Sequence, residues 1–162
     1  MNDLTAKLAS SSRVEMTELV MPPDANVLGT AFGGRVMQWI DLAASMAALR
    51  HARMTVVTAS IDELAFLAPI RLGEMAILGA QVNAVFGSSM EVEVSVTAEN
   101  PMAGDRRLCC RAYLTFVALG PEGKPQRAPL LLTETAEEER RAHEAFRRRA
   151  ERLSRRSKDN PR

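Results

Sequence analysis

The sequence predicts an α+β domain in which one long helix lies against a curved antiparallel sheet. Two observations carry this prediction: one apolar helical stretch at residues 35–51, and four later segments with the period-two pattern of β-strands. A helix enclosed by such a sheet buries both of its sides. The sheet edges stay open and the core stays small, so we also expect a dimer.

The elements follow in order along the chain. Residues 1–12 are polar and expected to be flexible, and residues 13–21 alternate polar and apolar side chains as a strand does. The helix at 35–51 contains no Gly or Pro and is apolar on nearly all its faces, which is typical of a buried helix. Strands are then expected at residues 55–67, 74–86, 89–98 and 106–119.

The segment at 89–98 has the strictest alternation. Its valines lie on one face, whereas Glu91 and Glu93 lie on the other. This pattern is typical of a sheet with one covered face and one face in water.

The chain beyond residue 120 differs in character. We expect residues 121–162 to form a linker and a charged helix that begins near Thr133 or Thr135. Its apolar stripe is narrow, and Glu137–Arg141 and two further i,i+4 pairs cover its surface. The pattern fits a solvated helix, and it also fits one that packs weakly on the body or on a neighbouring subunit.

Composition excludes several classes of protein. The chain has 162 residues, the size of one domain, with 46% hydrophobic and 25% charged residues. These values exclude a disordered, collagen-like or membrane-spanning protein. A net charge of +1 and 4% aromatic residues argue against nucleic acid or an anionic membrane as the partner.

The cysteines and the N-terminus indicate a compartment. Cys109 and Cys110 are adjacent on an expected strand, so they cannot form an ordinary structural disulfide with each other. The N-terminal residues lack the apolar core of a secretory signal, and no apolar run reaches the ~20 residues that span a bilayer. We therefore expect a cytoplasmic protein that has no contact with a membrane.

Asp41 and the glycine pair before it are the first candidates for chemistry. Asp41 interrupts an apolar helix, where a carboxylate needs a partner or a function. Either Ser45 or backbone groups satisfy it, or it acts as a general base or nucleophile. Gly33-Gly34 opens the same helix, where free N–H groups can polarise a carbonyl oxygen, although a simple helix-start turn explains the pair equally well.

Other candidates are fewer. Asn26, in the loop before the glycines, is either a structural turn residue or a group that orients water or donates to a carbonyl. His51 and His143 are the only histidines, and no GxSxG elbow, phosphate-binding loop or metal-ligand spacing occurs. Hydrolysis by this chain would therefore use an Asp, directly or through water.

Several segments resemble the hotdog-fold acyl-CoA thioesterases of the cytosolic acyl-CoA hydrolase family, in its bacterial short-form branch. The resemblance covers roughly residues 14–145, through MPPDANVLGTAFGGRVMQWIDLAA, VVTASIDELAFLAPIRLGE, SSMEVEV and DRRLCCRAYLTFVAL. It implies a hotdog domain at residues 13–120 that hydrolyses acyl-CoA to free fatty acid and coenzyme A. It also implies a homodimer, assembled further into a hexamer as a trimer of dimers, with no metal and no cofactor beyond the coenzyme A of the substrate.

The resemblance also implies roles for particular residues. Asn26 and Asp41 match the catalytic pair, and the helix that polarises the carbonyl begins at Gly33 and Gly34. The coenzyme A site takes in Thr58, Ser60, Gly87, Ser88, Ser89, Arg107 and Arg111. The chain departs from the family at Thr30, where Asn is common, at Leu42, where an acidic residue often follows the Asp, and at Gly87, where a larger or basic residue is common.

Helix geometry independently favours a site shared between two chains. Gly34 and Asp41 are seven positions apart, roughly 10 Å along the helix axis at ~1.5 Å per residue. The carboxylate would reach a carbonyl at the start of an antiparallel partner helix more easily than one at its own. Two alternatives to a thioesterase stay open: an enoyl-thioester hydratase on the same fold, and an acyl-CoA-binding sensor without activity.

Overall fold

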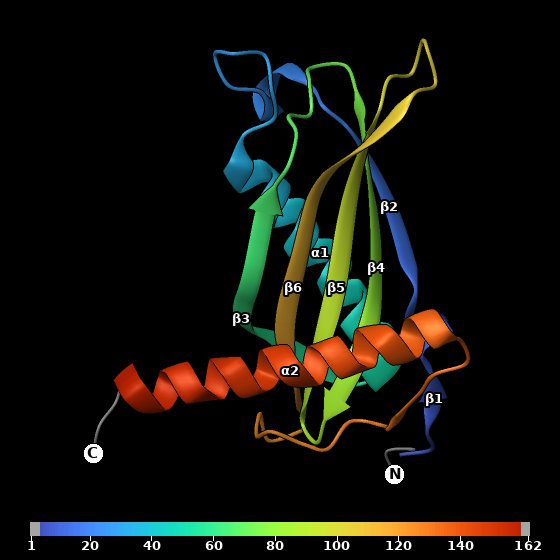
Figure 1. Cartoon of the computed structure of the whole chain (residues 1–162), viewed down its shortest axis with the longest axis vertical. Helices are drawn as coiled ribbons and strands as arrows, with labels where there is room; N and C mark the ends of the chain where they lie inside the picture. Colours follow the sequence, from blue (N-terminus) through green and yellow to red (C-terminus); the bar gives the residue numbers. More distant parts are fainter. Residues whose placement is uncertain (1–3, 160–162) are drawn as a thin grey trace.

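A five-stranded antiparallel sheet separates two long helices (Figure 1). The computed structural model describes residues 4–159, with side chains up to residue 157. In spatial order the strands are β2 (Val14–Leu19), β4 (Met75–Phe86), β5 (Ser89–Glu99), β6 (Arg106–Leu119) and β3 (Thr55–Phe66). The helices are α1 (Gly33–Ala52) and α2 (Ala136–Asp159), and the short elements are β1 (Lys7–Leu8), β7 (Leu131–Leu132) and two 3₁₀ turns at Ala9–Ser12 and Pro22–Asp24. The expected α+β architecture is confirmed.

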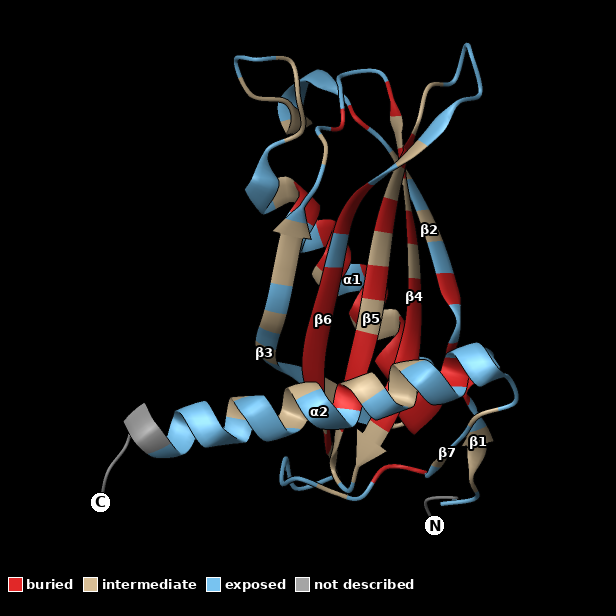
Figure 2. Ribbon diagram, in the orientation of Figure 1, coloured by how far each residue is buried: buried red, intermediate tan, exposed pale blue. Residues whose placement is uncertain are grey.

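The inner side of α1 packs on one face of the sheet. Ala43, Ala44 and Ala47 have no exposed surface, and Val36 and Ile40 flank them at 3% and 1% exposed. The short alanines let the helix lie close to the strands, while the larger side chains fill the core. The sheet supplies the facing apolar layer, including Val92, Val94 and Val96, and these central strands are the most buried part of the molecule (Figure 2).

The outer side of α1 is not buried in the single chain, contrary to the expectation of a helix buried all round. Met37, Leu42 and Leu49 are 38%, 49% and 44% exposed. Only one side of the helix faces the sheet, because the sheet curves around α1 without closing over it. The result is an uncovered apolar face of the kind that a second copy of the chain covers.

The C-terminal helix α2 crosses the other face of the sheet (Figure 1). The side chains that it turns toward the strands alternate at spacings of three and four residues, and they are mostly polar: Glu138, Arg141, Ala145, Arg148 and Arg152. Phe146, on the expected apolar stripe, packs edge-on against Phe86 but stays 56% exposed. The helix therefore docks on the body largely through polar contacts, and not mainly through the stripe.

Burial under α2 corrects the expectation that Glu91 faces water. The Glu91 side chain is 1% exposed, and Arg148 Nη2 lies 2.7 Å from its Oε1. The Arg148 guanidinium also lies 3.7 Å from the centre of the Tyr113 ring. A neighbouring bond joins Gln81 Nε2 to Glu138 Oε1 at 3.0 Å. Glu91 lies on the face opposite the valines, as the alternation predicts, but α2 covers this face.

The N-terminal segment corrects the expectation that residues 1–12 are flexible. β1 pairs in parallel with β7, and Ala9 and Ser12 are 1% and 0% exposed. Ser12 Oγ accepts a 3.0 Å hydrogen bond from the backbone N–H of Val82. Residues 4–12 therefore form part of the folded domain. The expectation for residues 1–3 lies outside the residues that the structure describes.

Candidate active site

Asp41 lies in the middle of α1, and its partner is on the edge strand β3. Thr58 Oγ1 donates a 2.7 Å hydrogen bond to Asp41 Oδ1. Ser45 instead donates to the carbonyl of Leu42 at 2.8 Å, so the interpretation that paired Ser45 with Asp41 is wrong. Asp41 is half-buried and Thr58 is exposed. The carboxylate is therefore oriented through one oxygen, on the side of the chain that no other element covers.

Asn26 is fixed by the turn that it begins. Its Oδ1 accepts hydrogen bonds from the backbone N–H groups of Leu28 at 2.9 Å and Thr30 at 3.2 Å, while Nδ2 donates to Thr30 Oγ1 at 3.0 Å. An amide nitrogen carries two hydrogens, so one donor of Asn26 is left for a water or a carbonyl. The structural and functional interpretations of Asn26 are thus compatible, because the turn holds the oxygen and leaves a donor free.

The start of α1 has the features that a carbonyl-binding site needs. Its N-cap residue, Phe32, makes no side-chain capping bond, so the first-turn N–H groups have no side-chain cap. Gly33 borders a cavity of about 370 Å³ that is also lined by Val36, Phe66 and Cys110. A Cβ at Gly34 would meet nothing within 4 Å. The positive end of the helix therefore faces open, largely apolar space, where an oxygen that gains negative charge would be stabilised.

The residues that the family resemblance assigns to the coenzyme A site lie in two separate places. Gly87, with φ of +77°, forms the turn between β4 and β5, and Ser88 and Ser89 follow it. In the sheet register Ser89 pairs with Val117, and Ser60 pairs with the nearby Thr115. Ser60 and Ser89 also line one cavity. These residues therefore lie together at one end of the sheet, near Thr58.

Arg107 and Arg111 lie elsewhere. Arg107 is ten residues from Val117 on β6, roughly 33 Å at ~3.3 Å per residue. Its Nη1 donates to Glu74 Oε1 at 2.9 Å, and this bond holds the Glu74 pKa below its ordinary value and the Arg107 pKa above it. Arg111 Nε lies 3.6 Å from Glu93 Oε1 on the face that carries α2. The structure does not bring either arginine to the end of the sheet where Ser60 and Ser89 meet.

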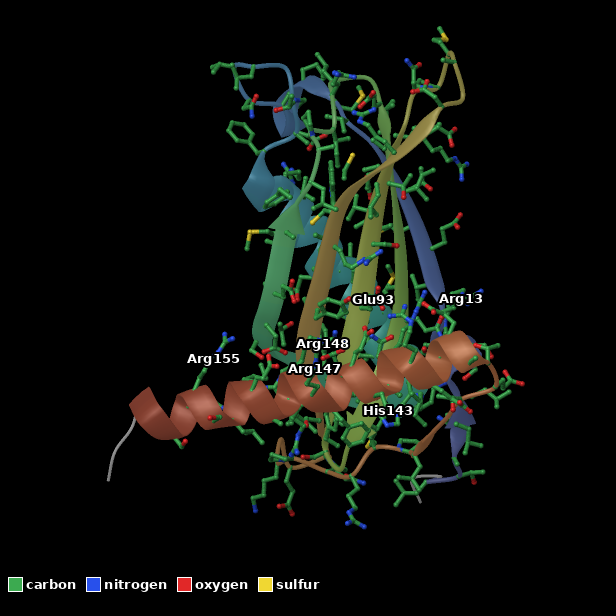
Figure 3. All side chains as sticks on the ribbon, in the orientation of Figure 1. Arg13, Glu93, His143, Arg147, Arg148 and Arg155 are labelled. Carbon is green, nitrogen blue, oxygen red and sulfur yellow. The ribbon has the colours of Figure 1, made fainter. Side chains whose placement is uncertain are left out.

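Cys110, His51 and His143 do not supply a second nucleophile or base beside Asp41. Burial raises the pKa of Cys110 to about 11, which keeps this thiol protonated near neutral pH. His51 is fully buried at the end of α1, with Nε2 2.9 Å from the carbonyl of Pro129, and burial lowers its pKa. His143 lies on α2, on the opposite side of the sheet from α1 (Figure 3). Neither histidine stands beside Asp41.

Residues 4–159 show neither a cluster of metal ligands nor a membrane-spanning helix. In this range no three His, Cys, Asp or Glu side chains are grouped so that they could hold a metal ion. Neither long helix of the same range is apolar enough to cross a bilayer.

Comparisons with known proteins agree with this geometry. Residues 28–105 match the Thioesterase superfamily model. The uncharacterized acyl-CoA thioester hydrolase YkhA of Bacillus subtilis is 44% identical over 132 residues, which cover 82% of this chain and 77% of YkhA. Mouse, rat and human relatives are longer, and the chain spans between 23% and 36% of their length.

Solved structures give the same result. An acyl-CoA hydrolase of Staphylococcus aureus, solved with butyryl coenzyme A and coenzyme A, is 37% identical, with a TM-score of 0.89 over 95% of this chain and 94% of that one. An apo-hexameric acyl-CoA thioesterase is 39% identical, with a TM-score of 0.90 over 93% and 97%. The fold and the site thus define a hotdog-fold thioesterase. Within that superfamily, the chain belongs to the acyl-CoA thioester hydrolase family.

Proposed function

We propose that this protein is a thioesterase that hydrolyses acyl-CoA to a free fatty acid and coenzyme A. The observation that carries the proposal is the Asp41 carboxylate, held by Thr58 on an uncovered apolar face of a chain whose relatives are acyl-CoA hydrolases. Hydrolysis of a thioester needs an oriented base or nucleophile and a donor for the carbonyl oxygen. Asp41 and the open start of α1 supply these two groups.

The active site takes its groups from two protomers. Gly34 and Asp41 are seven residues apart on one helix, roughly 10 Å along its axis. A second copy that packs antiparallel on the exposed Met37 and Leu42 would place its Asp41 near the first copy's Gly34. In addition, covering this face would bury the half-exposed carboxylate and exclude bulk water from the thioester.

The reaction follows from these positions. The thioester oxygen lies at the Gly34 N–H of one protomer, and the free Nδ2 hydrogen of Asn26 orients the water or the carbonyl. The partner's Asp41 removes a proton from a water that attacks the carbonyl carbon, the carbon–sulfur bond breaks, and the protonated Asp41 returns the proton to the coenzyme A sulfur. In the alternative route the carboxylate attacks the carbon directly and expels the coenzyme A thiolate, and a water then hydrolyses the mixed anhydride to release the fatty acid, leaving the Asp41 carboxylate and a proton for the thiolate. In support, S. aureus relatives have been solved as alanine variants of an Asp, an Asn and a Thr, the residue types found here at the site.

The assembly, location and cofactor needs belong to the same proposal. The chain forms dimers that assemble into a hexamer as a trimer of dimers, as supported by two related thioesterases solved as hexamers. It acts in the cytoplasm, in line with the mammalian relatives named cytosolic acyl coenzyme A thioester hydrolases. It works without a metal or another cofactor, because the proposed reaction uses only Asp41, Asn26 and backbone N–H groups.

Release of free thiol tests the proposal. Purified protein is mixed with acyl-CoAs of increasing chain length, and coenzyme A is detected with a chromogenic disulfide reagent. Asp41→Asn keeps the side-chain volume but removes the base, so kcat should fall at least ~100-fold. Asp105→Asn, in an exposed turn, is the matched control and should keep wild-type activity. A folded Asp41→Asn variant with near-normal kcat contradicts the assignment.

A further inference from the structure

The last two turns of α2 extend past the edge of their own sheet. The side chains of α2 find their partners in the spatial order of the strands: Gln81 on β4, then Glu91 on β5, and finally Asp62 on the edge strand β3. Arg152, which bonds to Asp62, is the last described residue of the helix to bond to the sheet, and seven more residues follow it. These residues 153–159, which we call the overhang, continue beyond β3 (Figure 1).

The overhang is not covered in the single chain. Every described residue from Leu153 to Ser157 is exposed. Arg155 and Arg156 line a cavity beside β3, yet neither forms an ion pair among the described side chains, and Figure 3 shows Arg155 beyond the β3 edge. Short helical segments without tertiary contacts are marginally stable in water. The two exposed turns would therefore be stabilised by a surface that their own chain does not supply.

The uncovered apolar face of α1 continues around the β3 edge toward the overhang. On that face Asp41 bonds to Thr58 of β3. The neighbouring Val57 is 44% exposed, and Ile61, at 40%, lines the cavity that also contains Leu153 of the overhang. Exposed apolar side chains thus extend from α1 across the edge of the sheet to the far end of α2.

A second copy that covers the α1 face would therefore also reach the overhang. A dimer with two-fold symmetry uses the same patch on both protomers. Because this patch includes the β3 edge, the β3 edge of one copy faces the β3 edge of the other. The overhang of each protomer then crosses the boundary and projects over the sheet of its partner.

The charges on the two sides of this boundary are complementary. Glu63 of β3 pairs in register with Tyr113, whose ring lies under Arg148, so Glu63 is on the face of the sheet that carries α2. Glu63 is exposed and forms no ion pair among the described side chains. Arg155 and Arg156 supply two unpaired guanidinium groups, which bind a carboxylate through paired hydrogen bonds.

We propose that the overhang clasps the second protomer of the dimer. Arg155 and Arg156 pair with Glu63 of the partner subunit, and Leu153 packs beside the apolar residues of the two β3 edges. Two-fold symmetry gives each dimer two such clasps. The inference rests on the function proposed above, because the position of the partner is that of the shared active site. The overhang holds together the two chains that build each site and contacts no reacting atom.

An exchange of charges between two chains tests the pairing. One chain carries Arg155→Glu/Arg156→Glu, and the other carries Glu63→Arg. Each homodimer then has like charges at both clasps, whereas the mixed dimer has opposite charges at both. After co-refolding of differently tagged chains, native mass spectrometry should count more than ~80% mixed dimers, against one half for random pairing. If the arginines pair with Glu63 of their own chain instead, pairing stays random and the proposal is overturned.

The control separates the clasp from a general effect of net charge. Lys124→Glu/Arg127→Glu makes the same change of charge at two exposed positions of the segment before α2. Mixed with the Glu63→Arg chain, this control should give the random half of mixed dimers. An equal excess of mixed dimers in the control would overturn the proposal.

Cross-linking provides a second measurement with milder substitutions. A chain with Arg156→Cys is mixed with a chain that carries Glu63→Cys, and a short bismaleimide should link the two chains. Arg140→Cys, at an exposed position near the start of α2, replaces Arg156→Cys in the control and should give no link to Glu63→Cys. The native thiols of Cys109 and Cys110 are buried and should not react.

The outcomes distinguish the clasp from the proposed function. Random pairing and no cross-link in a dimer that hydrolyses acyl-CoA overturn the clasp alone. A wild type that is active as a monomer overturns both the clasp and the shared active site. Selective pairing and a cross-link in a protein that releases no thiol support the clasp and contradict the thioesterase function.

Discussion

Substitution of Arg148 by Met should destabilise the protein by leaving a carboxylate buried without its partner. Glu91 is 1% exposed and Arg148 12%, and the two are joined by hydrogen bonds of 2.7 and 3.1 Å. Met keeps most of the aliphatic stem that packs on Tyr113, so the lost charge dominates. Breaking a buried pair from one side costs about 3–5 kcal/mol. Asn83 Nδ2, 3.4 Å from Glu91, compensates weakly, so we expect a loss near the lower end, about 3 kcal/mol.

Urea unfolding, followed by circular dichroism, measures this loss. For a chain of this size about 3 kcal/mol corresponds to a decrease in Tm of roughly 6–12 °C. The double variant Glu91→Gln/Arg148→Met removes both charges and should recover most of the loss. Arg147→Met, on the neighbouring exposed position, is the control and should change stability by less than about 0.5 kcal/mol. The reasoning is refuted if Arg148→Met costs no more than Arg147→Met, or if the double variant is as unstable as the single one.

Three further changes test the site and the core. Thr58→Val should lower kcat about tenfold, because Asp41 loses the hydrogen bond that orients it. Thr58→Ser keeps the hydroxyl group and should retain activity in the thiol-release assay. Equal rates for the two variants would show that the Thr58–Asp41 hydrogen bond does not contribute to catalysis. Gly34→Ala should leave the free energy of unfolding within about 1 kcal/mol of the wild-type value. It should still lower kcat, because the added methyl group projects into the open space at the start of α1, where the substrate carbonyl is proposed to bind. An unchanged kcat would show that Gly34 is not part of the active site. Burial lowers the pKa of His51 below its ordinary value of 6.5. Below pH 6.5 the unfolded chain therefore binds a proton at His51 that the folded chain does not bind. The free energy of unfolding then falls by up to ~1.4 kcal/mol per pH unit until the pH reaches the lowered pKa of the folded state. Urea unfolding at pH 7 and pH 5 should show this decrease in the wild type and in His143→Gln but not in His51→Gln, and the same slope in His51→Gln would contradict it.

Much of the fold could be predicted because its signals are local. The helix expected at residues 35–51 spans Gly33–Ala52, and the strand expected at 106–119 spans Arg106–Leu119. Both segments have a clear apolar period and end at Gly or Pro or at a change of period. The short pair β1 and β7 was missed, because two residues on each strand are too few for a period to appear.

The environment of α2 could not be read from local patterns. The alternation predicts that Glu91 lies on the solvent-exposed face of the sheet. Strand alternation shows which face a side chain is on, but it does not show which element covers that face. A signal did exist: Glu138, Arg141 and Arg148 recur with a heptad-like spacing on one side of the helix. Charged residues at these positions indicate a solvated helix when the sequence is considered alone. Their partners lie on strands that are distant in the sequence, so the local pattern does not reveal the ion pairs.

The site was predictable in part. Asp41 stood out because an apolar helix surrounds it in the sequence, but its partner Thr58 is 17 residues away and only the docking of α1 on β3 brings the two together. Asn26 and Thr30 are close enough for a turn to be expected, and the structure adds which atoms that turn uses. The placement of Arg107 and Arg111 depended on strand register, which a period-two pattern does not determine.

Complementation between two inactive variants tests the shared active site most directly. Asn26→Ala and Asp41→Ala should each be nearly inactive as homodimers. In a mixed dimer, one site combines both lesions, whereas the other takes intact Asn26 from one chain and intact Asp41 from the other. A random mixture contains about half heterodimers, so co-refolded protein should regain roughly a quarter of wild-type activity. If verified heterodimers show only the average of the two parent variants, the two residues act within one chain and the shared site is wrong.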